Sequence, residues 1–225
     1  MTVPENVEVG VLRWVPPKIQ GLVRDLRVRW ALEEAGWPYR EHVIDGEEPK
    51  STSYRALPPC GQLPAFRCDD VTLFESGAIL LYIAERSVAL MPAELTWRSE
   101  VGKWILRALN SVEPPILMLN ILDMLSERPK DNGLKALRDW LVASIESRLD
   151  TLVPVMQGKQ YVLGRFTAAD VLLTTVLRIL RDTDLVKCRP ALKEYQRRCE
   201  ARPAFQKALA DHMANFAKHA PPRHP

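Results

Sequence analysis

Residues 61–85, GQLPAFRCDDVTLFESGAILLYIAE, decide the fold of this chain. The segment LPAF (63–66) indicates a short strand with a proline inside it, and the two aspartates at 69–70 are typical of a turn. Residues 71–74 predict a second strand. Apolar residues at helical spacing predict a helix from position 75 onward. The order is therefore strand, turn, strand, helix.

The junction between the second strand and the helix predicts a small-molecule site. A proline inside a strand is confined to an edge or a special backbone position, where free backbone groups can pair with an extended, peptide-like ligand. The helix start offers N–H groups and partial positive charge to a carboxylate. Glu75 is placed to bind an ammonium group, and Ser76 to bind the neighbouring carboxylate. The alternative is that this pair only starts the helix.

The segments PPCGQLPAF (58–66) and FESGAILLYIAE (74–85) resemble the glutathione-binding half of the glutathione S-transferases, of bacterial type. The resemblance implies a cis bond before Pro64 and backbone pairing of Leu63 with the cysteinyl unit of glutathione. It further implies that Glu75 and Ser76 hold the γ-glutamyl end, and that Gln62 bonds the glycyl carboxylate. Glutathione is thus expected as a co-substrate.

The rest of the chain fits the same architecture. Strand candidates at 7–15 and 39–44 flank a helix at 21–36, and residues 50–57 are expected to form a short helix or loop. With the opening stretch they predict an α/β thioredoxin-like domain over 7–86. A linker covers 87–97, and an all-α domain covers 98–218. Its helices are predicted at 98–127, 133–156, 168–182, 190–201 and 203–218. The tail, 219–225, is expected to be disordered.

A second local signature lies in the helical domain. Thr167 and Asp170 have the spacing of a capping box at a helix start. The family has a similar box, whose role is structural, so both residues are assigned to folding.

Composition excludes several function classes. The chain has 225 residues and a net charge of +3, too weak to indicate nucleic acid. We expect no signal peptide, no membrane span and a reduced, cytoplasmic protein. Four cysteines and four histidines lack metal-ligand spacing, so no metal is expected. The resemblance implies a homodimer with a role in detoxification.

The match is atypical at the catalytic position. Glutathione S-transferases stabilise the glutathione thiolate, usually with a Tyr, Ser or Cys just after the first strand. Residues 14–36, WVPPKIQGLVRDLRVRWALEEAG, contain none of the three. Alignment through the helix places Arg24 near the sulfur, where its charge and main-chain N–H groups around 20–22 would stabilise the thiolate. The alternative is a structural ion pair of Arg24 with Asp25 or Glu75.

Two further features surround this position. Alignment through the strand places Trp14 at the family's catalytic tyrosine, and it is interpreted as a wall of the electrophile pocket or as a core residue. Arg24, Arg27 and Arg29 form a basic cluster, expected to be a solvated or dimer-facing surface.

The second substrate is expected over the helix at 98–127, which Pro114-Pro115 kinks or ends. Trp104 and Arg107 are candidates to bind it, or else core residues of the helical bundle. Three functions remain open. The first is a glutathione transferase that conjugates or reduces small hydrophobic electrophiles, with glutathione peroxidase activity as a further expectation. The second is a glutathione-dependent isomerase or dehalogenase. The third is a non-catalytic binding module of the same fold.

Overall fold

The computed structural model describes residues 3–44, 63–125 and 132–221. They form two compact units, one of Met1–Ala93 with Ala201–Pro225 and one of Glu94–Glu200. The sequence predicts an all-helical domain over 98–218. In the structure the helix over 203–218 belongs to the first unit, because it packs along the first helix of the chain. The predicted helix or loop at 50–57 lies outside the described residues.

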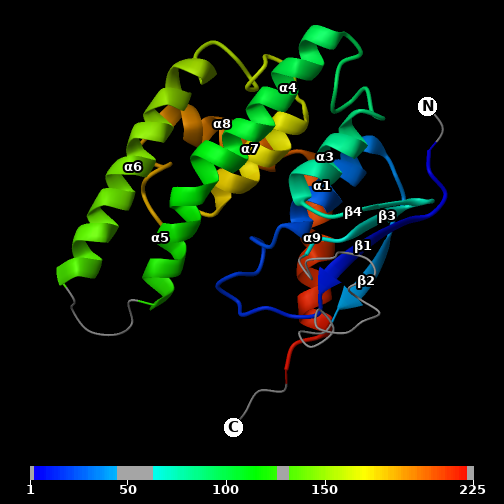
Figure 1. The fold of residues 1–225 in the computed structure, drawn as a ribbon, viewed down its shortest axis with the longest axis horizontal. Coiled ribbons are helices and arrows are strands. Elements are labelled where there is room, and N and C mark those ends of the chain that lie inside the picture. The colour runs from blue at the N-terminus through cyan, green and yellow to red at the C-terminus, as the bar shows by residue number, and fades with distance from the viewer. Residues whose placement is uncertain (1–2, 45–62, 126–131, 222–225) are drawn as a thin grey trace. The chain divides into compact units, whose positions relative to one another are not determined.

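The first unit contains a mixed sheet. Its described strands are β1 (Val7–Leu12), β2 (Arg40–Ile44), β3 (Phe66–Cys68) and β4 (Val71–Leu73), in the order β2-β1-β3-β4 (Figure 1). β1 runs parallel to β2 and antiparallel to β3, and β3 and β4 form an antiparallel hairpin. The thioredoxin-like fold expected from the sequence is confirmed.

Three helices of this unit pack together: α1 (Asp25–Ala35), α3 (Ser76–Ala84) and α9 (Pro203–Lys218). α1 contacts β1, α3 and α9, so residues 25–32 are all buried. The predicted glycine stop is confirmed, since Gly36 has a φ of 68° at the end of α1. The predicted helix start at position 21 was wrong, because Gly21 adopts a φ of 78° in the preceding turns.

The expectation of a solvated basic cluster was also wrong. Arg27 is 2% exposed and Arg29 is 0% exposed, since α1 has neighbours on several sides. Arg29 bonds Asp25 and Glu41, and Arg27 donates to the hydroxyl of Ser76. Buried guanidinium groups require such partners.

The second unit is helical. Its core element is α7 (Ala168–Arg178), whose first ten residues are all buried. The predicted capping box at its start is confirmed: the Thr167 N–H donates to Asp170 Oδ2 over 2.9 Å. The surrounding elements are α4 (Leu95–Arg107), a π-helical turn η2 (Ala108–Val112), α5 (Glu113–Leu125), α6 (Asn132–Met156) and α8 (Pro190–Glu200).

The predicted helix at 98–127 is interrupted at η2, as the proline pair indicates. Pro114 and Pro115 have no N–H to donate to the preceding helical turn. The carbonyl of Ser111 instead accepts a hydrogen bond of 2.6 Å from Arg148 Nε of α6. This side chain satisfies a backbone group that the helix leaves open.

Membrane-spanning helices and metal-binding clusters are both absent from the described residues. None of the described helices combines the length and the apolar character that a membrane span requires. The described part of the chain also holds no group of three or more His, Cys, Asp and Glu side chains able to bind a metal ion.

Candidate functional site

The candidate site lies in the first unit, at one end of the central strands of the sheet. β3 begins beside the end of β1, where the Gly10 N–H donates to the Ala65 carbonyl over 2.8 Å. The hairpin register pairs Phe66 with Leu73, so residues before β3 and after β4 leave from this same end. This end of the sheet therefore brings together the segment between β1 and α1, the residues before β3 and the start of α3.

The Leu63–Pro64 peptide bond is cis, which confirms the expectation from the sequence. Pro64 is buried and Leu63 is half-buried. A Cβ on Gly10 would lie 3.2 Å from Leu63 Cδ2, so a glycine in β1 makes room for this leucine. The neighbouring Gln62 lies outside the described residues.

Glu75 and Ser76 stand at the start of α3 with different environments. Glu75 is exposed and has a φ of 66°, a conformation that L-residues adopt at a cost and that concentrates at functional sites. Ser76 is only 3% exposed, and its Oγ accepts a hydrogen bond of 3.2 Å from Arg27 Nη1. No side chain caps α3 among the described residues. The helix start thus joins open N–H groups, a hydroxyl and a buried guanidinium, all suited to a carboxylate.

The segment between β1 and α1, residues 13–24, carries Trp14 and Arg24, both half-buried. Arg24 directly precedes the first residue of α1. The main-chain N–H groups expected to assist it already have acceptors within the protein. Those of Gln20, Gly21 and Leu22 donate respectively to Pro17 O, His212 Nε2 and Ile19 O. They are therefore not offered to a ligand in this state, and Arg24 remains the candidate group.

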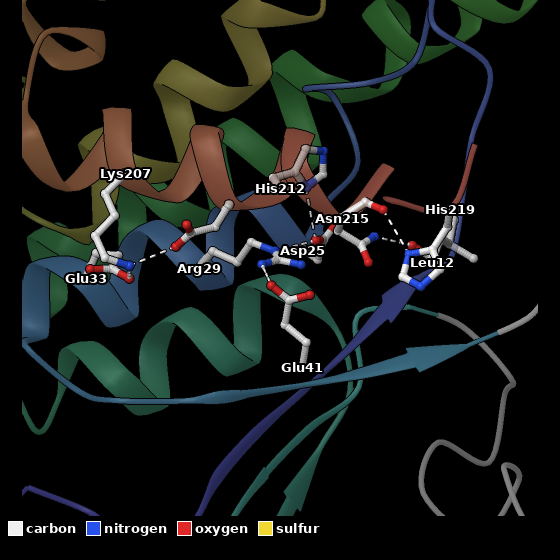
Figure 2. A network of polar contacts seen from close by, with 10 residues as sticks. Leu12, Asp25, Arg29, Glu33, Glu41, Lys207, His212, Asn215 and His219 are labelled. Carbon is white, nitrogen blue, oxygen red and sulfur yellow. Dashed lines mark hydrogen bonds and ion pairs between the residues drawn. The ribbon is translucent and has the colours of Figure 1, made fainter. Parts of the chain in front are cut away.

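A buried polar network supports the start of α1 (Figure 2). Asp25 Oδ2 accepts from Arg29 Nε at 2.8 Å and lies 3.1 Å from His212 Nδ1. Burial alone would raise the pKa of Asp25, but its bonds with His212 and Arg29 hold that pKa below its usual value. Burial alone would lower the pKa of Arg29, and Glu41 and Asp25 raise it. Asp25 and Arg29 are thus a charged pair in the core.

Trp104 and Arg107, the candidates for the second substrate, lie in the second unit. Trp104 is 9% exposed, and the Arg107 guanidinium lies 5.1 Å from the centre of its ring. Arg107 Nη2 also donates to Thr151 Oγ1 of α6 over 2.7 Å. These contacts give both residues a structural role in the bundle.

Sequence reasoning missed three residues that contact the candidate site: Arg27, His212 and Asn215. Arg27 carries a local signal, because it lies three positions after Arg24, in the first turn of α1. His212 and Asn215 lie on α9, and their contacts with Gly21 and Leu12 span 191 and 203 residues. No local pattern indicates contacts at such separations.

Comparison with known proteins agrees with this geometry. Residues 19–85 match the family model "Glutathione S-transferase, N-terminal domain". Glutathione S-transferase F11 of Arabidopsis thaliana is 29% identical over 181 residues, covering 75% of this chain and 83% of that protein. A probable maleylacetoacetate isomerase 2 of Drosophila melanogaster is 25% identical and covers 81% of each chain.

Solved structures show the same fold. A glutathione transferase from Burkholderia graminis, with two glutathione molecules bound per subunit, superposes with a TM-score of 0.77. It shares 24% identity, and the match covers 98% of this chain and 90% of that one. The matched model, the relatives and the shared fold agree with the cis bond before Pro64 and the Glu75-Ser76 helix start: residues 19–85 are similar to the N-terminal domain of the glutathione S-transferases, and the chain has the glutathione S-transferase fold.

Proposed function

We propose that the chain is a glutathione transferase that conjugates or reduces small hydrophobic electrophiles. One observation carries the proposal: the cis Leu63–Pro64 bond, the Glu75-Ser76 helix start and the segment 13–24 all lie at the same end of the sheet. Glutathione is a peptide-like ligand with an ammonium group, two carboxylates and a thiol. This end of the sheet has a matching protein group for most of these groups of glutathione.

In this proposal each group holds one part of glutathione. The backbone of Leu63 pairs with the cysteinyl unit, and Gln62 bonds the glycyl carboxylate. Ser76 and the open N–H groups of α3 bind the γ-glutamyl carboxylate, with the charge of Arg27 behind them. The exposed carboxylate of Glu75 binds the ammonium group.

Arg24 is proposed to stabilise the thiolate, because a cation within about 4–6 Å of an anion favours the ionised form. The sulfur then attacks an electrophilic carbon, forming a carbon–sulfur bond while the leaving group departs with its electron pair. Trp14 is proposed as one wall of the electrophile pocket, and Trp104 and Arg107 are separate candidates to bind the second substrate. The absence of a Tyr, Ser or Cys in residues 14–36 leaves this charge as the activating group.

Binding is tested by titrating the protein with glutathione in a calorimeter. Glu75→Ala removes a charge-assisted hydrogen bond of about 1.5–3 kcal/mol, so the Kd should rise about 10- to 100-fold. Arg67→Ala is the matched control, since Arg67 forms an exposed pair with Glu8 on the strands. Failure of the wild-type protein to bind glutathione would refute the proposal.

Thiol activation is tested by recording the thiolate absorbance of bound glutathione against pH. Arg24→Ala should raise the pKa of the bound thiol by about 1 unit or more and reduce the rate with an aryl halide. An unchanged pH profile would show that Arg24 has another role.

A second candidate is a glutathione-dependent isomerase, favoured by the similarity to the Drosophila melanogaster isomerase. Isomerisation of maleylacetoacetate without net consumption of glutathione would favour it over transfer. A protein that binds glutathione and turns over neither substrate would be the non-catalytic module. A homodimer in the cytoplasm with a role in detoxification completes the proposal, and sedimentation tests the assembly.

A further inference from the structure

Helix α9 bonds both ends of the segment between β1 and α1. Asn215 Nδ2 donates to the carbonyl of Leu12, the last residue of β1, over 2.8 Å (Figure 2). The N–H of Gly21, three residues before Arg24, donates to His212 Nε2 over 3.2 Å. His212 and Asn215 lie three positions apart, so they share one face of the helix.

The hydrogen bonds fix the protonation state of His212. A ring nitrogen that accepts a hydrogen bond from a backbone N–H carries no proton itself. Nε2 is therefore the bare nitrogen, and Nδ1, 3.1 Å from Asp25 Oδ2, carries the proton. Arg29 holds the same carboxylate oxygen from the other side. The polar chain runs from Arg29 through Asp25 and His212 to Gly21.

The side chains of His212 and Asn215 are buried, so bulk water cannot replace the hydrogen bonds that they make. His212 is 1% exposed and Asn215 is 6% exposed, and the His212 ring packs edge-on against Phe216 at 4.7 Å between centres. A buried backbone group that loses its partner cannot recover the bond from bulk water. The segment therefore has a preferred position for as long as α9 is docked.

Other contacts dock α9 without touching residues 13–24. Arg202 bonds Glu34 at 2.6 and 2.7 Å, Lys207 bonds Glu33 at 2.7 Å, and Phe205 packs against Trp30. All of these partners lie on the body of α1. These three contacts attach α9 through residues other than His212 and Asn215, and His212 adds a bond of its own to Asp25 of α1.

We propose that His212 and Asn215 are positioning residues of the glutathione site. They hold the segment that carries Trp14 and Arg24 at this end of the sheet. They act through Gly21 and Leu12 and touch no substrate. The inference rests on the proposed function for its effect on glutathione, whereas the restraint of the segment stands on the hydrogen bonds alone.

The restraint is tested first, without any ligand. Two-bond ¹⁵N–¹H correlation spectra should show His212 with its proton on Nδ1, and the Gly21 amide should be protected from hydrogen exchange. His212→Gln and Asn215→Leu should accelerate exchange within residues 13–24 about 5- to 10-fold, the loss expected for one buried hydrogen bond. A proton on Nε2, or unchanged exchange in both variants, would overturn the inference.

The effect on glutathione is tested with the same two variants. Both should raise the KM for glutathione and the pKa of its bound thiol, because Arg24 is no longer held in place. Phe205→Leu is the matched control: it weakens docking of α9 and lowers Tm, but keeps the KM and the pH profile. If the two variants behave like this control, the positioning role fails. Lack of glutathione binding by the wild type would overturn the proposed function instead, and the exchange data would still decide the restraint.

Discussion

Neutralising Asp25 separates the charge of the buried network from its hydrogen bonds. Arg29 Nε and His212 Nδ1 both bond Asp25 Oδ2, whereas Oδ1 has no hydrogen-bond partner in the part of the chain that the structure describes. In Asp25→Asn the amide oxygen can take the place of Oδ2, and the NH₂ group that of Oδ1. Both bonds then survive and only the charge is lost.

The two substitutions at this position should differ in cost. Arg29 keeps Glu41 at 2.5 Å, so its charge stays balanced in Asp25→Asn. A bond to a charged group is worth about 1 kcal/mol more than a neutral one, so two such bonds give about 2 kcal/mol. Asp25→Leu removes both bonds and leaves polar groups buried, and it should cost about 4 kcal/mol, in the range of a broken buried pair.

Urea denaturation followed by circular dichroism measures both costs as shifts in the midpoint. Glu8→Gln is the control, since its exposed pair with Arg67 should be worth less than about 1 kcal/mol. The Asp25 pKa is lowered in the folded state, so its stabilisation exists above the ordinary value of 3.8 and is lost as the pH falls through the folded pKa. Equal costs for Asn and Leu, or a cost below about 1 kcal/mol for Leu, would refute the reasoning.

Three further changes test other parts of the molecule. Burial raises the pKa of Asp170 to about 6 against the hydrogen bonds it accepts, so its stabilisation is present at low pH and lost as the pH rises through 6. Lowering the pH from 7 to 5 should therefore stabilise the wild type by about 1 kcal/mol relative to Asp170→Asn in thermal melts, and a pH-independent difference would contradict this. Gly10→Ala would bring a Cβ within 3.1–3.2 Å of three side chains, one of them Leu63. It should cost about 1–3 kcal/mol and weaken glutathione binding, whereas an unchanged Tm would show that the neighbours yield. Arg148→Met leaves the Ser111 carbonyl of η2 without this donor and should cost about 1–3 kcal/mol in urea, and an unchanged midpoint would contradict this.

The local signals of the sequence were sufficient for most of the fold. The turn at 69–70 and the helix start at 75–76 follow from neighbouring residues, and the cis bond before Pro64 follows from the family resemblance of this segment; all three are confirmed. The start of α9 is similar, because Pro203 directly follows Arg202 and is favourable in the first helical turn.

The rest depended on partners far along the chain. Gly21 suggests a helix start in the sequence, but it lies in the turns that lead to α1 and its N–H bonds His212. Arg27 and Arg29 have the composition of a surface, yet they are buried because Ser76, Glu41 and Asp25 satisfy them. Charged residues can enter a core only with such partners, and a single sequence does not reveal which distant residues supply them.

The docking of α9 on α1 has a consequence for the order of synthesis. The whole of Glu94–Glu200 is translated between the two segments of the first unit. A nascent chain therefore emerges with the α9 side of α1, including the ring of Trp30 and the Asp25–Arg29 pair, still uncovered. Domains generally fold as they leave the ribosome, the N-terminal one first. Here the helical unit can fold before the sheet unit is closed, so a ribosome-bound chain that stops before residue 203 should expose the surface that chaperones recognise.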